Sequence, residues 1–182
     1  EHDSILVQSV SGMFTPDYWN FSMFKTISEN AGKEVSSGTL SILTDPMQPL
    51  LKYFPTENHS DWQWWSITRN SRPMILNATR GEYRPLIQVV DNIERNHKLG
   101  LVFEFAVGKG KLLVCMTNLR AIADMPEGRQ FRTSLLRYVK SDAFRPVELL
   151  TWEELNALFH ADINQRMIIG VKNESDYTIG ND

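Results

Sequence analysis

The chain has 182 residues, of which 42% are hydrophobic and 23% charged, and its formal net charge at pH 7 is −3. These values are typical of one globular domain with a sizeable core, and they exclude a bulk electrostatic attraction to nucleic acid or to anionic membranes. No apolar run approaches the roughly 18 residues that a membrane-spanning helix needs, so no membrane insertion is expected.

The N-terminal region predicts a buried strand followed by a helix. Residues 5–10 are an apolar run typical of a buried strand, and the chain enters it almost at once, as expected of a piece cut from a larger protein. Thr15 is the expected N-cap of the helix, with Pro16 at its first position. Four apolar side chains then recur at helical spacing: Trp19, Met23, Phe24 and Ile27.

Further strands are predicted by short apolar runs that end at polar or glycine-containing turns. The last two are joined through residues 108–110, a glycine-containing link typical of a hairpin. Glu104 lies between Phe103 and Phe105 on the first of these two and is expected to pair with a lysine or arginine. The predicted strands cover residues 40–43, 73–76, 86–90, 99–107 and 111–118.

Capping patterns predict three more helices. Asp45 is the expected cap of a brief helix that turns the apolar residues near position 50 inward. Asp124 with Glu127, and Thr151 with Glu154, match the capping box, in which the first side chain and the fourth satisfy each other's backbone N–H groups.

The stretch 54–65 holds the densest aromatic cluster of the chain, with three of its five tryptophans. If this stretch is extended, Trp62 and Trp64 share one face and Trp65 lies on the other, so the three indoles cannot form one flat platform. At least one indole is then expected in the core. Two interpretations remain open: packing in the core or against another domain, and stacking of an exposed indole on a sugar ring.

Polar side chains precede these tryptophans. Glu57, His59 and Asp61 could act as an acid–base pair or as metal ligands, or simply cap and solvate the loop. The spacing matches no established metal motif, so no metal ligand and no cofactor is predicted. A second polar group contains Asp91, Glu94 and His97, and a turn held by Asx-type hydrogen bonds explains it equally well.

Strands interleaved with helices predict an α/β layered fold, and the hairpin makes its sheet mixed. The domain is expected to cover residues 1–160, with 161–182 as a tail that is either an edge strand or disordered. Cys115 lies inside an apolar strand, where a buried, inert thiol is expected rather than a nucleophile. The chain carries no P-loop, no dinucleotide-binding glycine motif, no nucleophile elbow and no zinc-protease helix.

The string FPTENHSDWQWW at 54–65 resembles a C-terminal region of bacterial family-2 glycoside hydrolases of the β-galactosidase type. Other segments of the same region match in the same order, over about residues 4–146. They lie at 14–20, 38–46, 90–100, 103–104, 107–112, 128–130 and 134–138.

The resemblance implies a class I glutamine-amidotransferase-like domain of flavodoxin-like type, a three-layer sandwich with a mixed, mostly parallel sheet. Active amidotransferases carry their cysteine at a Gly-x-Cys-x-Gly elbow, which is missing around Cys115. The resemblance therefore implies a non-catalytic accessory domain of a larger glycosidase, without catalytic residues of its own. It also implies export to the periplasm or the cell surface.

Three functions are thus open at the level of sequence. The first is an accessory domain that packs against other domains of a parent glycosidase and helps to shape its sugar site. The second is a carbohydrate-binding module that holds an oligosaccharide with an exposed tryptophan. The third is a stand-alone hydrolase using His59 or His97 with nearby carboxylates. For the first two, the expected contact residues are Trp62, Trp64, Trp65, His59 and Asp61.

Overall fold

A computed structural model of the protein describes residues 39–91 and 96–159. In this part the chain forms one mixed sheet of six strands with three α-helices and one 3-10 helix, an α/β fold. The predicted strand at 5–10, the helix from Thr15 and the tail 161–182 lie outside the described residues. The strands are β1 (Ser41–Thr44), β2 (Met74–Ile75), β3 (Ile87–Val90), β4 (Lys98–Val107), β5 (Gly110–Cys115) and β6 (Leu149–Leu150); the helices are η1 (Pro49–Leu51), α2 (Trp62–Arg69), α3 (Pro126–Val139) and α4 (Trp152–Phe159).

The sheet is built around β4. The order is β1-β3-β4-β2, and β5 and β6 also pair with β4. Four of these strand pairings are antiparallel and only β4 with β6 is parallel, so the expected mostly parallel sheet is wrong for the described residues. The reason is the length of the links: β3 and β4, and β4 and β5, are joined by connections too short for the helical crossover that parallel neighbours require.

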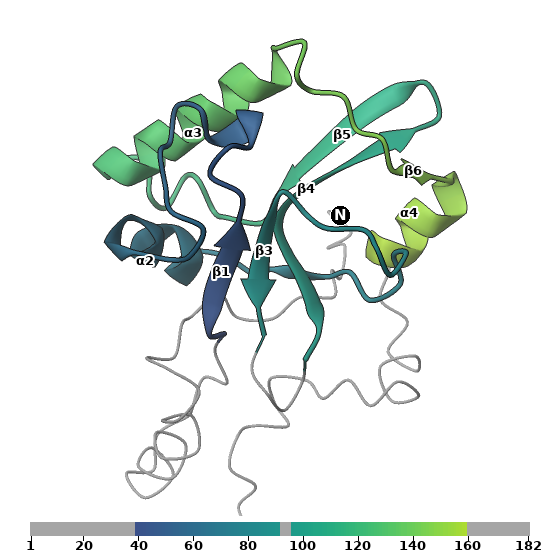
Figure 1. Ribbon diagram of the computed structural model, residues 1–182, viewed down its shortest axis with the longest axis horizontal. Helices are drawn as coiled ribbons and strands as arrows, with labels where there is room; N and C mark the ends of the chain where they lie inside the picture. Colours follow the sequence, from purple (N-terminus) through teal and green to yellow (C-terminus); the bar gives the residue numbers. More distant parts are fainter. Residues whose placement is uncertain (1–38, 92–95, 160–182) are drawn as a thin grey trace, which may run out of the picture.

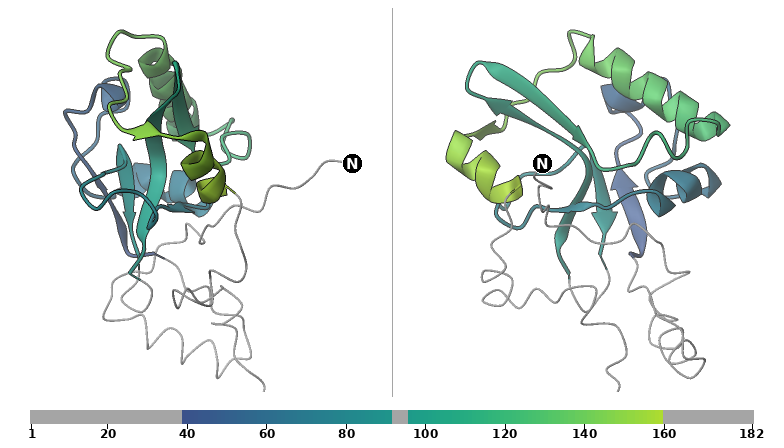
Figure 2. Two further views of the ribbon diagram at one scale, coloured as in Figure 1. Left: turned by 90° about the vertical axis from the view of Figure 1, so that its right-hand side faces the viewer. Right: turned by 180° about the vertical axis from the view of Figure 1, so that it is seen from behind.

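Apolar side chains fill both faces of this sheet. Figures 1 and 2 show α2 and α3 together on one side of β4 and α4 on the other. The first cluster packs the sheet against α2, α3 and η1, and includes Trp64, Ile67 and Phe131. The second packs it against α4, and includes Phe103, Phe105 and Leu158. The predicted layering of helices around the sheet is therefore confirmed.

A bulge in β4 decides which way its side chains point. Ile87 pairs with Val102 while the next residue, Gln88, pairs with Gly100, which leaves Leu101 as an extra residue. An extra residue bends the strand and changes the phase of its side-chain alternation.

The side chains of β4 change face at this bulge. Leu99 and Leu101 lie in the first cluster, whereas Phe103 and Phe105 lie in the second. Glu104, between these two phenylalanines, consequently points toward α3.

The predictions for the C-terminal half hold in most respects. Gly108 has φ of 56°, a conformation that favours glycine, and it turns the β4–β5 hairpin as expected. The capping box at α4 is confirmed, since the Thr151 N–H donates to the Glu154 carboxylate (2.8 Å) and the Glu154 N–H to the Thr151 hydroxyl (3.1 Å).

The other predicted capping box, formed by Asp124 and Glu127 at the start of α3, is wrong. Its N-cap is Met125, without a side-chain cap, and Pro126 follows at the first helical position. The Glu127 carboxylate instead accepts a 2.5 Å hydrogen bond from the Ser66 hydroxyl, so it joins α3 to α2.

Candidate functional site

The tryptophan stretch is a helix rather than the extended segment expected from its aromatic content. Asp61 caps it, with its carboxylate accepting from the Gln63 N–H at 3.0 Å. Residues three and four apart on a helix share a face, so the outward surface carries Trp62 and Trp65 while Trp64 points inward. The exposed fractions are 89% for Trp62, 44% for Trp65 and 0% for Trp64.

Trp64 is a core residue. Its ring meets Phe54 and Phe131 edge to face, with centroid separations of 5.2 and 5.7 Å. Its indole N–H donates to the Thr56 hydroxyl at 2.7 Å, which satisfies the one polar group of the buried ring. The prediction that at least one indole is buried is confirmed.

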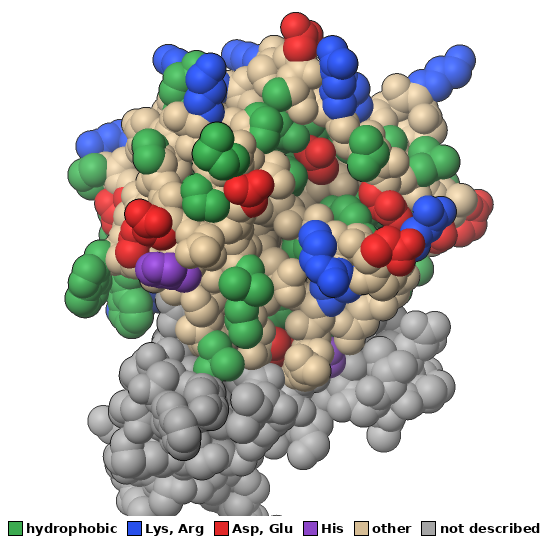
Figure 3. Space-filling model, in the orientation of Figure 1, with side chains coloured by type: hydrophobic (Ala, Val, Ile, Leu, Met, Phe, Trp, Pro, Cys, Tyr) green, Lys and Arg blue, Asp and Glu red, His purple; other side chains and the backbone are tan. Residues whose placement is uncertain are grey.

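The two outward tryptophans form an indole surface on α2, defined here as Trp62, Trp65 and the neighbouring His59. His59 is exposed in the loop before α2, and its Nδ1 lies 3.1 Å from the carbonyl oxygen of Ser60. In Figure 3, hydrophobic side chains and a histidine lie next to each other on the side of the molecule that carries α2. The structure thus exposes three of the five expected contact residues, His59, Trp62 and Trp65, whereas it places Trp64 in the core and uses Asp61 as a cap.

The two described residues of the second polar group, Asp91 and His97, are joined by a hydrogen bond. The Asp91 carboxylate accepts from the His97 N–H at 3.0 Å, and the Asn77 side-chain amide lies 2.9 Å from the His97 Nδ1. Glu94 lies outside the described residues. Within 39–91 and 96–159, no group of three or more His, Cys, Asp and Glu side chains could hold a metal ion.

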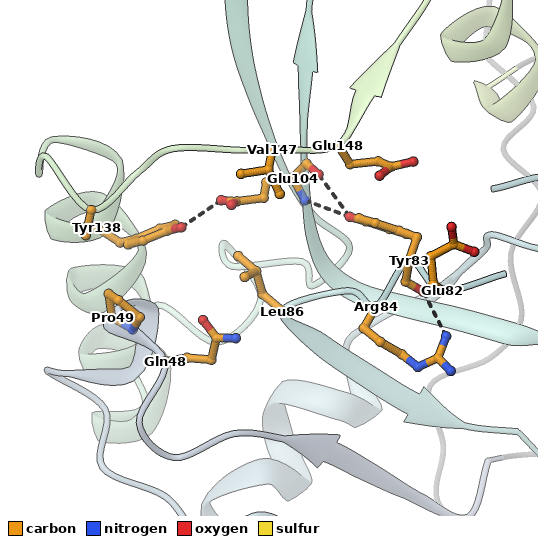
Figure 4. A pocket seen from close by; sticks show the side chains of 11 residues that line it. Gln48, Pro49, Glu82, Tyr83, Arg84, Leu86, Glu104, Tyr138, Val147 and Glu148 are labelled. Carbon is orange, nitrogen blue, oxygen red and sulfur yellow. Dashed lines mark hydrogen bonds between the residues drawn. The ribbon is translucent and has the colours of Figure 1, made fainter. Parts of the chain in front are cut away.

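A separate pocket of about 440 Å³ opens where β4 faces the end of α3. Figure 4 shows Gln48 across this pocket from Glu104, with Tyr138 and Tyr83 on either side. Its polar lining residues are Gln48, Glu82, Tyr83, Arg84, Glu104, Tyr138 and Glu148. With three carboxylates against one guanidinium, this pocket favours hydroxyl or amine groups over anions.

Two tyrosines hold Glu104 in place. The Tyr138 hydroxyl donates to the Glu104 carboxylate at 2.8 Å. The Tyr83 hydroxyl donates to the Glu104 carbonyl at 2.9 Å and accepts from the Glu104 N–H at 3.2 Å. The backbone and the side chain of Glu104 are therefore both held in place. A polar group that fixes the orientation of a ligand in a pocket needs such support.

Burial is the largest influence on the pKa values of Glu104 and Tyr138. Burial raises the pKa of Glu104, and the hydrogen bond from Tyr138 and the charge of Lys111 oppose that rise. Burial and the hydrogen bond to Glu104 raise the pKa of Tyr138 as well, so its hydroxyl remains a donor.

Glu104→Gln tests this assignment through pH. A carboxyl with a raised folded-state pKa contributes stability that is fully present below its unfolded pKa, about 4.3, and is lost as pH rises through the folded value. The amide keeps an acceptor for Tyr138 and cannot ionise. We expect the variant to gain stability relative to the original chain as the pH rises from 4 to 7, by less than about 1 kcal/mol because solvent screens the half-buried carboxyl.

Urea unfolding at pH 4, 5.5 and 7 measures this difference. Tyr138→Phe is the companion variant, because it removes the bond that opposes the rise in the pKa of Glu104 and should steepen the loss of stability above pH 5. A Glu104→Gln difference that is the same at all three pH values would show that the carboxyl does not titrate differently in the folded chain.

Cys115 is not poised for nucleophilic chemistry. It lies at the end of β5, and burial raises the pKa of its thiol, which disfavours the reactive thiolate. The expectation of an unreactive cysteine in a strand agrees with this environment.

The sequence signals for the pocket were weak. Glu104 was expected to pair with a lysine or arginine, but its hydrogen-bond partner is Tyr138. Tyr138 and Tyr83 were not predicted as site residues, since tyrosine on an apolar helix face is usually read as core. The one available signal was a carboxylate flanked by two phenylalanines on a strand.

A comparison with protein families shows to which family the chain belongs. A family model described as a domain of unknown function, DUF8487, matches residues 1–160, and the chain belongs to that family. No curated protein matches it. Within residues 39–91 and 96–159, no helix has the length and apolar character needed to cross a membrane.

Proposed function

We propose that this protein is a non-catalytic accessory domain of a larger carbohydrate-active enzyme, a family-2 glycoside hydrolase of the β-galactosidase type. Its role is to pack against the neighbouring domains of that exported enzyme and to help shape the sugar site. The observation that carries the proposal is the indole surface of α2, where Trp62 is 89% and Trp65 is 44% exposed.

Exposed indoles in this arrangement favour a macromolecular contact. A buried aromatic side chain removes about 150–250 Å² from water, and tryptophan is enriched in protein interfaces. The opposite face of the same helix buries Trp64, so α2 is held firmly while it presents the other two rings. Domain contacts within a chain bury roughly 600–1,500 Å², to which these two rings would contribute a substantial part.

The finer fold class, glutamine-amidotransferase-like, is part of the same proposal. Helices on both faces of a mixed sheet support it. The raised pKa of the half-buried Cys115 thiol supports a domain of that type without amidotransferase chemistry.

Replacing both exposed indoles, Trp62→Ala with Trp65→Ala, tests the proposal. In the isolated chain we expect a loss of stability of no more than about 2 kcal/mol, because Trp62 is almost entirely in solvent and Trp65 is 44% exposed. In the complete protein encoded by the reading frame, the same pair should lower the melting temperature and speed proteolytic release of this domain. Equal, small effects in both settings would contradict the domain contact.

A second candidate function is carbohydrate binding by the same indoles, favoured by the very high exposure of Trp62. An indole can stack on a sugar ring and donate its N–H to a hydroxyl. Titration with galactose- or xylose-containing oligomers should then quench or shift tryptophan fluorescence, and Trp62→Phe should reduce the change. No response to any of these oligomers would eliminate this candidate.

A further inference from the structure

Three arginine side chains surround a groove between α3 and the loop before it. The groove has a volume of about 650 Å³. Leu119, Arg120 and Ala123 line it from the loop, and Arg129 and Arg132 line it from the helix.

The backbone brings these guanidinium groups together. Gly128 of α3 lies directly against the Ile122 carbonyl, so close that an added Cβ would be 2.1 Å from that oxygen. The Arg129 guanidinium donates to the Asp124 carbonyl at 2.7 Å, which ties the helix to the loop. Arg132 follows three residues later on the same helix face, and Arg120 enters from the loop opposite.

The groove is cationic although the chain as a whole has a net charge of −3. No carboxylate side chain lines it. Arg120, Arg129 and Arg132 form no ion pair with another described residue, although the charge of Arg129 helps to lower the pKa of the nearby Glu127. All three are exposed.

We propose that this groove binds a small molecule bearing a phosphate or sulfate group. Guanidinium groups present planar pairs of N–H donors that match the oxygens of such anions, and several of them around one cleft give charge-assisted bonds from more than one side. The volume lies in the range of small-molecule sites and exceeds what a bare oxyanion fills. Leu119 and Ala123 offer an apolar wall to the organic part. This site shares no residue with the indole surface and does not depend on the accessory role.

Calorimetric titration at constant ionic strength, with three probes, tests the site. Glucose 6-phosphate and inorganic phosphate should both bind, and neutral glucose should not. If glucose 6-phosphate binds more tightly than inorganic phosphate, the apolar wall contacts the organic part of the ligand. If the two affinities are equal, the groove recognises the oxyanion alone. No binding of either phosphate compound, or binding of glucose as tight as that of its phosphate, would overturn the proposal.

Arginine variants locate the site. Arg120→Gln and Arg132→Gln should each weaken phosphate binding about tenfold, the loss expected for one charge-assisted hydrogen bond. Arg145→Gln is the matched control, because Arg145 is exposed, lies outside the groove and loses the same charge. It should change the affinity less than about twofold. A control effect equal to that of Arg120→Gln would overturn the proposal, and circular dichroism of each variant verifies that it is folded.

Discussion

Trp64→Ala should destabilise the chain by about 3–5 kcal/mol, the loss typical of deleting a large buried aromatic side chain. The ring is fully buried between Phe54 and Phe131, and its N–H is bonded to Thr56. Removing it leaves a cavity between α2 and α3 and takes away the donor that bonds the Thr56 hydroxyl. Urea unfolding followed by circular dichroism measures the change.

Trp62→Ala is the matched control for this variant. It removes the same side chain two positions away on the same helix, where the ring is almost entirely in solvent. Its cost should be within about 0.5 kcal/mol. A loss as large as that of Trp64→Ala would show that Trp62 is packed in the domain itself, and the indole surface would no longer be available to a partner.

Gly128→Ala should cost at least about 3 kcal/mol, at the upper end of the range for overpacked sites. Helix propensity alone predicts the opposite, since alanine is favoured over glycine by about 1 kcal/mol in a helix. The added Cβ, however, would lie 2.1 Å from the backbone oxygen of Ile122, and a backbone group cannot rotate away as a side chain can. The clash therefore outweighs the gain in helix propensity, and we expect Gly128→Ala to lower the stability.

Gly81→Ala provides the comparison for that prediction. A Cβ at this position meets no atom within 4 Å, so the stability should change by less than about 1 kcal/mol. Thermal unfolding of both variants, monitored by circular dichroism, should give a much lower melting temperature for Gly128→Ala than for Gly81→Ala. Equal melting temperatures would mean that the loop before α3 is not packed as closely as the structure has it.

Two features set by neighbouring residues were predictable from the sequence. The hairpin at Gly108 and the capping box of Thr151 and Glu154 each depend on a few adjacent residues, and both are confirmed. The helix at the tryptophans was missed because aromatic residues favour strands, although the cap at Asp61 and the three- and four-residue spacing of buried positions were both present.

Features set by the pairing of distant segments were not predictable. The extra residue at Leu101 turns Glu104 toward α3, and only there does it meet Tyr138, 34 positions later. The mostly parallel sheet was expected from the family resemblance, but the short links between β3, β4 and β5 impose antiparallel neighbours. The arginine groove likewise depends on how a loop packs on α3.

Hydroxyl-radical footprinting, performed on this chain alone and on the complete protein encoded by the reading frame, tests the accessory role most directly. Trp62 and Trp65 should oxidise readily in the isolated chain and be protected in the complete protein, while the buried Trp64 should be protected in both. Equal oxidation of Trp62 and Trp65 in the two samples, or a reading frame that encodes no further domain, would contradict the account.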